Sequence, residues 1–217
     1  MIGVNSQMST SSPHNASARP GAGVEGNARL TATNGMLLLA LLAIEGFTIL
    51  SVRQMIVLHI FLGILLIGPV LLKTGSTTYR FARYYTGALS YLAKGPPSPL
   101  LRLLGPLVIV SSLTLLGSGV ALLTVKPGNT GLLLTAHKAS FIIWVALMTI
   151  HVLGHLKDAV VTSWRELREG TRGPAAPRRT LRFALIALAL ILGVATATAL
   201  MPTAASWTAG TANRHDR

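Results

Sequence analysis

The chain alternates between long apolar runs and shorter polar connections. Five of the apolar runs are long enough to cross the hydrocarbon core of a bilayer, which takes about 20 helical residues. The proline residues near these runs stand close to their ends, where a missing backbone donor costs least. The pattern predicts an all-α integral membrane helical bundle with spans at residues 33–52, 54–72, 103–125, 132–156 and 181–201.

Both ends of the chain lack this pattern. Residues 1–30 are rich in Ser, Asn, Gly, Ala and Pro without periodicity, and such a composition cannot bury a core. The chain therefore divides into a disordered segment at 1–30, a five-span domain at 31–202 and a flexible tail at 203–217.

The composition agrees with a membrane protein and narrows the possible chemistry. The 217 residues are 51% hydrophobic and only 12% charged, whereas a soluble domain carries about 25% charged residues. The chain has no cysteine, which excludes disulfides, iron–sulfur clusters, thiolate metal sites and covalently attached c-type haem. A bound metal would have to use His, Met or carboxylate ligands.

The net charge of +13 predicts the orientation. Fourteen Lys and Arg residues lie in the N-terminal segment and the loops at 73–102 and 157–182, against four in the segments on the other side. The positive-inside rule then places the N-terminus in the cytoplasm and the C-terminus outside a plasma (inner) membrane. No nucleic-acid motif accompanies the charge, so lipid is the expected partner and nucleic acid is not. Residues 75–91, rich in Tyr and Arg, are typical of an interfacial amphipathic segment.

Four histidines lie within the predicted spans, where ionisable groups usually face the bundle interior. His137 and His151 are 14 residues apart, which is about 21 Å along a helix with only about 40° of rotation. His155, five turns beyond His137, falls on the same face. Two imidazoles at this separation match two haems stacked across a membrane.

His59 and His137 occupy equal depths on different spans, each about 7–8 Å below the predicted outer boundary. Two histidines at one depth on separate helices can supply both axial ligands of a b-type haem. Gly63, Gly117 and Gly119 lie near this level and would leave room for a flat macrocycle. The alternative is that the histidines and glycines only pack within the bundle.

Glu45 is the one acidic residue inside a predicted span, at the depth of His59. It is an ion-pair partner of Arg53 or Lys138, a hydrogen-bond acceptor for a haem ligand, or a proton acceptor beside a redox site. Arg53 lies at the outer rim, where it could pair with a haem propionate or remain a solvated charge.

The histidine positions resemble those of the bacterial cytochrome b561-like family, which includes the four-helix cytochrome b subunits of formate dehydrogenases and nickel–iron hydrogenases. The likeness is carried by residues 59–73, 117–122 and 137–155. The resemblance implies a four-helix b-type cytochrome core, here with a fifth transmembrane helix. It also implies an outer haem ligated by His59 and His137 and an inner haem ligated by His151.

The inner haem of that family takes its second ligand from the cytoplasmic end of the first helix. Residues 31–36 contain no His at that place, and Met36 is the candidate substitute. One haem b is therefore favoured over two. His151 and His155 then face a quinone or an inner cavity, or form hydrogen bonds within the bundle.

The resulting hypothesis is an electron-transfer subunit rather than a complete enzyme. It would pass electrons between a menaquinone or ubiquinone pool and a redox enzyme subunit such as a molybdopterin oxidoreductase, which similar helical bundles accompany. The alternative is a haem-free membrane protein that acts as an assembly or structural subunit. Transport along the histidines is disfavoured, because neither repeats nor broken helices are visible in the sequence.

The orientation can be tested with topology reporters fused after residue 100 and after residue 170. Both fusions should report the cytoplasm, because each follows a strongly basic segment. A periplasmic signal from either fusion would overturn the assignment of inner and outer ends.

Overall fold

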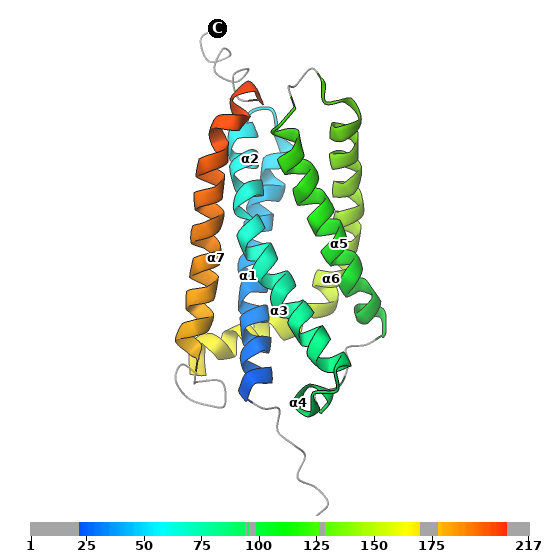
Figure 1. Ribbon diagram of the computed structural model, residues 1–217, viewed down its shortest axis with the longest axis vertical. Helices are drawn as coiled ribbons and strands as arrows, with labels where there is room; N and C mark the ends of the chain where they lie inside the picture. The colour runs from blue at the N-terminus through cyan, green and yellow to red at the C-terminus, as the bar shows by residue number, and fades with distance from the viewer. Residues whose placement is uncertain (1–21, 94, 96–98, 126–128, 170–177, 208–217) are drawn as a thin grey trace, which may run out of the picture.

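The structure is a bundle of long helices that run side by side along the long axis of the molecule (Figure 1). This computed structural model describes residues 22–93, 95, 99–125, 129–169 and 178–207, and all regular structure within them is helical. Five helices are long and apolar enough to cross a membrane. The prediction of an all-α, multi-pass membrane bundle with five spans is confirmed.

The helices follow one another in a simple order. The elements are α1 (Ala22–Leu50), α2 (Ile56–Leu65), α3 (Ile67–Tyr85), α4 (Leu89–Leu92), α5 (Pro99–Leu122), α6 (Gly131–Glu169), α7 (Arg179–Leu200) and the 3-10 helix η2 (Met201–Ala204). Together α2 and α3 form the second span. We call the end where α1 begins the N-terminal end of the bundle, and the end where α7 finishes the C-terminal end.

The long helices form two groups that α1 connects. Helix α7 packs against α2 and α3, while α5 packs mainly against α6. Helix α1 contacts α2, α3 and α7 on one side and α6 on the other. The space between the two groups is the place where a cavity can form.

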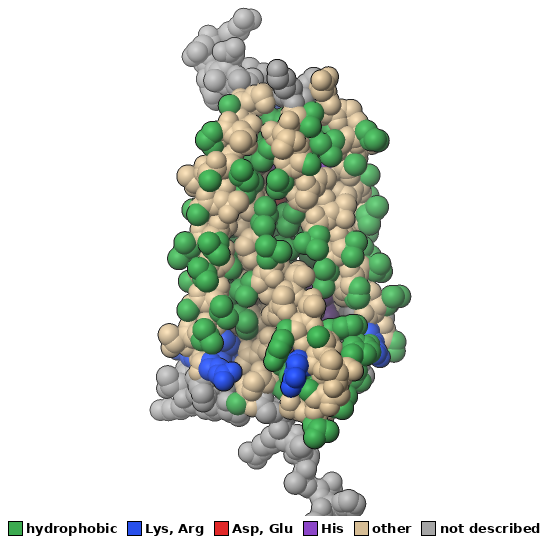
Figure 2. All heavy atoms as spheres, in the orientation of Figure 1, with side chains coloured by type: hydrophobic (Ala, Val, Ile, Leu, Met, Phe, Trp, Pro, Cys, Tyr) green, Lys and Arg blue, Asp and Glu red, His purple; other side chains and the backbone are tan. Residues whose placement is uncertain are grey.

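Apolar side chains cover the sides of the bundle, and polar groups lie inside it. Leu132 and Phe47 are 85% and 61% exposed, whereas Asn34 and Thr48 are completely buried. Figure 2 shows hydrophobic side chains spread over the sides, with Lys and Arg near the N-terminal end. This distribution suits a protein surrounded by lipid, since polar groups in hydrocarbon need internal partners.

Helix α1 begins earlier than the sequence predicts. Residues 22–30 are helical, so the expected disorder over 1–30 is wrong for this part, and residues 1–21 lie outside the described residues. The extra turns pack into the bundle, because Val24 and Arg29 are buried and Arg29 Nη1 lies 3.4 Å from Glu166 Oε2 of α6.

Other helices also continue past their predicted ends. Helix α3 runs to Tyr85, so residues 75–85 are not a separate interfacial segment and Lys73 lies in a helix rather than a loop. Helix α6 extends to Glu169, well into the predicted loop. Apolar runs mark only the lipid-crossing part, while helical hydrogen bonding can continue into water.

The predicted flexible tail is also partly wrong. Residues 203–207 are helical, and Trp207 Nε1 donates to the carbonyl oxygen of Leu122 at 3.1 Å. Residues 208–217 of that tail lie outside the described residues.

A proline and two glycines bring the second span close to α1 and α7. Pro69 has no N–H for the carbonyl of Leu65 four residues earlier, and a Cβ on Gly193 would lie only 2.3 Å from that oxygen. A Cβ on Gly68 would likewise lie 2.1 Å from the carbonyl oxygen of Ala189. Asn34 Nδ2 donates to the carbonyl oxygen of Pro69 at 2.8 Å. Only glycine permits this backbone approach.

A buried ionic cluster ties three helices together at the N-terminal end. Glu166 on α6 accepts from Arg182 of α7, with Nη2 at 2.6 Å and Nε at 2.9 Å from Oε1. Its other oxygen lies 3.4 Å from Nη1 of Arg29 on α1. The three residues are 2%, 6% and 4% exposed, so solvent hardly screens their attraction.

Replacing Glu166 with Ala should destabilise the bundle, because Arg29 and Arg182 lose their shared carboxylate. The expected loss is about 3–5 kcal/mol of unfolding free energy, seen as a lower thermal midpoint in detergent. Asp158→Ala, at an exposed position on the same helix, should change stability by less than about 0.5 kcal/mol. Equal stability of Glu166→Ala and wild type would contradict this role.

Candidate functional site: a histidine-lined cavity

A cavity of about 1270 Å³ lies between the two groups of helices, with walls from α1, α2, α3, α5 and α6. Its walls are mainly apolar, yet all four histidines of the spans line it. Glu45 and Lys73 line it as well. A cavity of this size is large for a small ligand and suits a bulky, mostly apolar cofactor.

His59 is held by two groups of α1. Its Nδ1 lies 2.8 Å from Glu45 Oε1 and 3.0 Å from Thr48 Oγ1. The Thr48 hydroxyl also donates to the backbone carbonyl of Glu45 at 2.6 Å, which directs its proton away from the ring. Both oxygens therefore accept from His59 Nδ1, and the neutral tautomer that satisfies both contacts has its lone pair on Nε2.

This contact identifies the partner of Glu45. Among the described ion pairs its carboxylate belongs to His59, not to Arg53 or Lys138. Glu45 therefore contacts a histidine of the predicted pair, and the role of that histidine as a haem ligand stays a prediction. The side chains of Glu45 and His59 are 12% and 23% exposed, so the bond is largely sheltered from solvent.

His137 is oriented in the same way by a different group. Its Nδ1 lies 2.9 Å from Ser118 Oγ on α5. The Ser118 hydroxyl donates to the carbonyl of Leu115 at 2.9 Å, so its oxygen accepts from the ring. The proton of His137 is therefore also on Nδ1, and Nε2 keeps its lone pair. A Cβ on Gly119 would lie 3.2 Å from His137 Cε1, so this glycine gives the ring its room.

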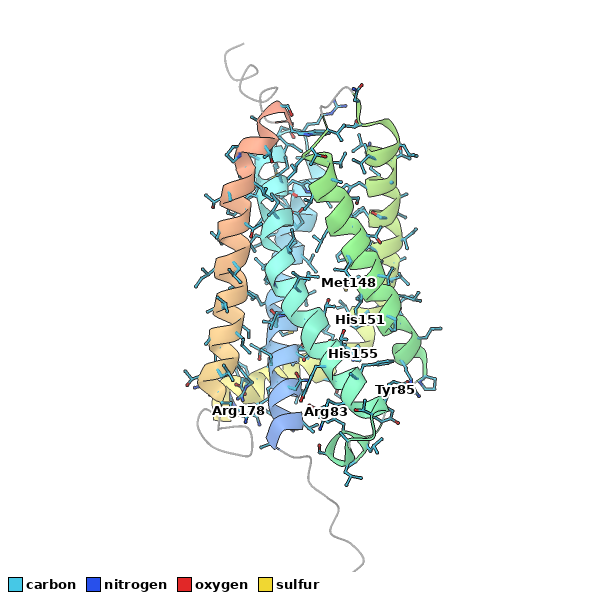
Figure 3. All side chains as sticks on the ribbon, viewed as in Figure 1. Arg83, Tyr85, Met148, His151, His155 and Arg178 are labelled. Carbon is cyan, nitrogen blue, oxygen red and sulfur yellow. The ribbon has the colours of Figure 1, made fainter. Side chains whose placement is uncertain are left out.

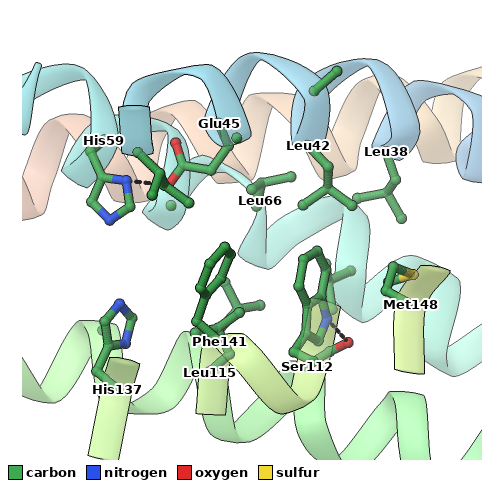
Figure 4. Close-up of a pocket in the computed structure, with 18 of the residues that line it drawn as sticks. Leu38, Leu42, Glu45, His59, Leu66, Ser112, Leu115, His137, Phe141 and Met148 are labelled. Atoms are coloured by element: carbon green, nitrogen blue, oxygen red, sulfur yellow. Dashed lines mark hydrogen bonds and ion pairs between the residues drawn. The ribbon is translucent and has the colours of Figure 1, made fainter. Parts of the chain in front are cut away.

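The two imidazoles face each other across the cavity. Figure 4 shows the Nε2 edges of His59 and His137 pointing toward the space between them, from opposite walls. The fold thus places the two predicted residues, on α2 and α6, on opposite walls of one cavity, while their pairing as haem ligands stays a prediction. Two free lone pairs directed at one space are what two axial ligands of a metal require.

Aromatic residues line the middle of the cavity, below this pair. Trp144 donates from Nε1 to Ser112 Oγ at 2.9 Å, which fixes the indole in place. Phe141 stacks on Trp144 with ring centroids 6.4 Å apart. Met148 lines the cavity further along α6 (Figure 4).

His151 and His155 line the N-terminal half of the cavity, beyond Met148 (Figure 3). Their ring centroids are 4.8 Å apart. His151 Nδ1 is buried and has no hydrogen-bond partner among the described residues. Lys73 and Met36 line the same cavity.

The remaining predicted site residues divide into two sets. Gly63 and Arg53 line the cavity, and a Cβ on Gly63 would lie 3.7 Å from Glu45 Oε1. Gly117 was predicted beside the cofactor, but it is exposed and does not line the cavity. Gly119 faces His137 instead, because side chains two positions apart on a helix point in directions that differ by about 200°.

Several residues of the site were missed by the sequence interpretation, and three of them make polar contacts that bear on the histidines or the charge of the cavity. Thr48 lies one turn after Glu45, which is a signal for a shared helix face. Lys73 follows His59 at the same 14-residue spacing that separates His137 from His151. Ser118 gave no signal, since its role depends on how α5 is rotated against α6.

The donor set fits a metal that brings its own equatorial ligands. Within the described residues, no three His, Asp or Glu side chains come together to hold a bare metal ion. A haem needs only two axial ligands from the protein, and His59 and His137 offer two.

No protein-family model, curated protein or solved structure matches this chain. Function is therefore inferred from the geometry of the cavity.

Proposed function

We propose that this protein is a membrane b-type cytochrome-like electron-transfer protein that holds haem b between His59 and His137. The observation that carries the proposal is the pair of Nε2 atoms that face one space from α2 and α6 (Figure 4). Each ring is fixed by a hydrogen bond at Nδ1. Such partners of the second ring nitrogen fix the tautomer and orientation of metal-bound histidines.

The residues around the pair suit the rest of the macrocycle. Apolar walls and the aromatic pair Phe141–Trp144 would lie against a flat ring. Arg53 and Lys138 also line the cavity, and either cation can pair with a propionate. When bound, haem b supplies one-electron exchange between its ferric and ferrous states. Because His59 and His137 would both hold the metal, these residues would favour electron transfer over catalysis at the metal.

We propose one haem rather than two. The resemblance requires a second inner ligand near the start of the first helix, where Gly35 and Met36 lie. Lys73 reaches this place: its Nζ donates to the carbonyl oxygen of Thr31 at 2.7 Å and would lie 2.8 Å from a Cβ on Gly35. A side chain that fills this space leaves His151 without an evident opposite ligand.

In the proposed arrangement the basic N-terminal end faces the cytoplasm of a plasma membrane. Electrons would pass between a membrane quinone and a redox enzyme subunit on the opposite side, for which a molybdopterin oxidoreductase is the candidate class. The support is the Lys and Arg residues at the N-terminal end (Figure 2) and the proximity of the His59–His137 pair to the other end.

The competing function is that of a haem-free structural or assembly subunit. The hydrogen bonds at His59 and His137 would then serve packing alone. That function gives no reason for both free nitrogens to face one space, which favours the haem.

Substitution of either histidine tests the proposal. His59→Ala and His137→Ala should each abolish haem binding or leave a five-coordinate iron, because each removes one axial ligand. The measurement is the reduced-minus-oxidised spectrum of protein purified from haem-supplied cells, with haem quantified per chain. His14→Ala and His215→Ala, outside the described residues, should match wild type. A wild-type protein without a b-type band would remove the proposal.

A second prediction concerns Glu45, which acts on the haem through His59. The carboxylate makes His59 a stronger donor and stabilises the ferric charge. Glu45→Gln should therefore raise the midpoint potential, by about 60 mV for each tenfold change in the redox equilibrium. Redox titration at fixed pH measures it, and haem content should stay unchanged. Ser118→Ala, which removes a neutral partner from His137, should have a smaller effect. An unchanged potential in Glu45→Gln would contradict this role.

A further inference from the structure

The N-terminal half of the cavity contains a cation, Lys73, that has no acidic partner in the part of the chain that the structure describes. Lys73 Nζ makes its single described hydrogen bond to the carbonyl oxygen of Thr31, and an ammonium group can donate three. The one acidic residue among the lining residues is Glu45, which pairs with His59. Lys73 therefore carries its charge into an apolar cavity without a described carboxylate beside it.

Helix geometry separates Lys73 from Glu45. Lys73 lies 14 residues beyond His59, and His151 lies 14 residues beyond His137. Each step is about 21 Å along its helix. Lys73 and His151 thus stand at one level of the cavity, a long way from the pair that we assign to haem.

The side chains that line the cavity at this level are donors of hydrogen bonds rather than acids, and Asp158, whose charge acts on His155, does not line the cavity. The cavity is lined at this level by polar side chains of α3 and α6, and Lys73 is the charged one. These residues are Lys73, Thr74, Thr77, His151 and His155. His151 Nδ1 is buried and has no partner among the described residues. A charged group taken out of water is costly unless it is paired, so an anionic oxygen would complete this cluster.

The walls between the two levels are apolar. Leu38, Leu42 and Met148 line the cavity from α1 and α6 (Figure 4). A ligand for this half therefore needs an anionic head for Lys73 and an apolar chain for these walls. The haem site takes the other half, which favours a single chain over the two chains of a phospholipid.

We propose that Lys73 binds the carboxylate of a single-chain amphiphile, a long-chain fatty acid, at the N-terminal end of the cavity. The ammonium group supplies the charge-assisted hydrogen bond, and the apolar walls cover the chain. This inference goes beyond the proposed electron transfer. The choice of a single chain rests on that proposed function, because haem would take the other half of the cavity, whereas the pairing of a carboxylate with Lys73 does not involve His59 or His137.

The test compares three probes on the purified protein in detergent: oleate, oleyl alcohol and dioleoylphosphatidate. Binding is measured by native mass spectrometry and by equilibrium dialysis of labelled oleate. Oleate should bind with one molecule per chain, at least about tenfold more tightly than oleyl alcohol, because only oleate can pair with Lys73. Equal binding of the acid and the alcohol would overturn the proposal, as would tighter binding of phosphatidate.

Variants locate the site. Lys73→Met should weaken oleate at least about tenfold and remove the preference over oleyl alcohol, while Lys73→Arg should retain it. Lys157→Met is the matched control, because Lys157 is exposed on α6, and it should bind as wild type does. Haem is quantified in every sample, so that a failure of the haem proposal can be distinguished from a failure of the fatty-acid proposal. If wild type holds two haems and Lys73→Met loses one, the cavity end is a haem site and the fatty-acid proposal is wrong.

Discussion

The separation of α1, α6 and α7 depends on the ion pairs that Glu166 forms with Arg29 and Arg182. Helix α6 packs mainly on α5 and α1. Without a further contact, the last turns of α6, at the N-terminal end of the bundle, would be joined to α7 only by the chain that connects them. The carboxylate binds Arg29 of α1 and Arg182 of α7 in a site almost closed to solvent. Because attraction between buried charges is weakly screened, three helices are fixed at one point. The cavity walls on α1 and α6 are then held at a set distance.

Close packing on the other side of the bundle complements this cluster. Gly68 and Gly193 let α7 approach the second span within the reach of backbone atoms, and Asn34 holds Pro69 from α1. One helix group is thus dense, while the gap between the groups stays open. A bundle in lipid can afford such a gap only if a ligand or apolar side chains fill it, because hydrocarbon gives no hydrophobic force to close it.

The two ends of the cavity differ in charge, and this difference organises the proposed chemistry. Near the C-terminal end a carboxylate supports His59, while a neutral hydroxyl supports His137. At the other end Lys73 meets the carbonyl of Thr31 and two histidines line the wall. The proposed haem site and the proposed carboxylate site can coexist in one cavity, because about 21 Å along the helices separates their two levels.

The helical class, the five spans and the equal depths of His59 and His137 could be predicted from the amino-acid sequence alone. Those features are local, since the length of an apolar run and the depth of a residue along it follow from helix geometry alone. The structure decided which residues surround the pair. Thr48 and Ser118 fix the tautomers, Gly117 faces outward, and Lys73 belongs to the cavity rather than to a loop. Spans that are apolar on every side do not specify how each helix is rotated or how far it continues into water. Those choices come from contacts between helices, which only the tertiary structure contains.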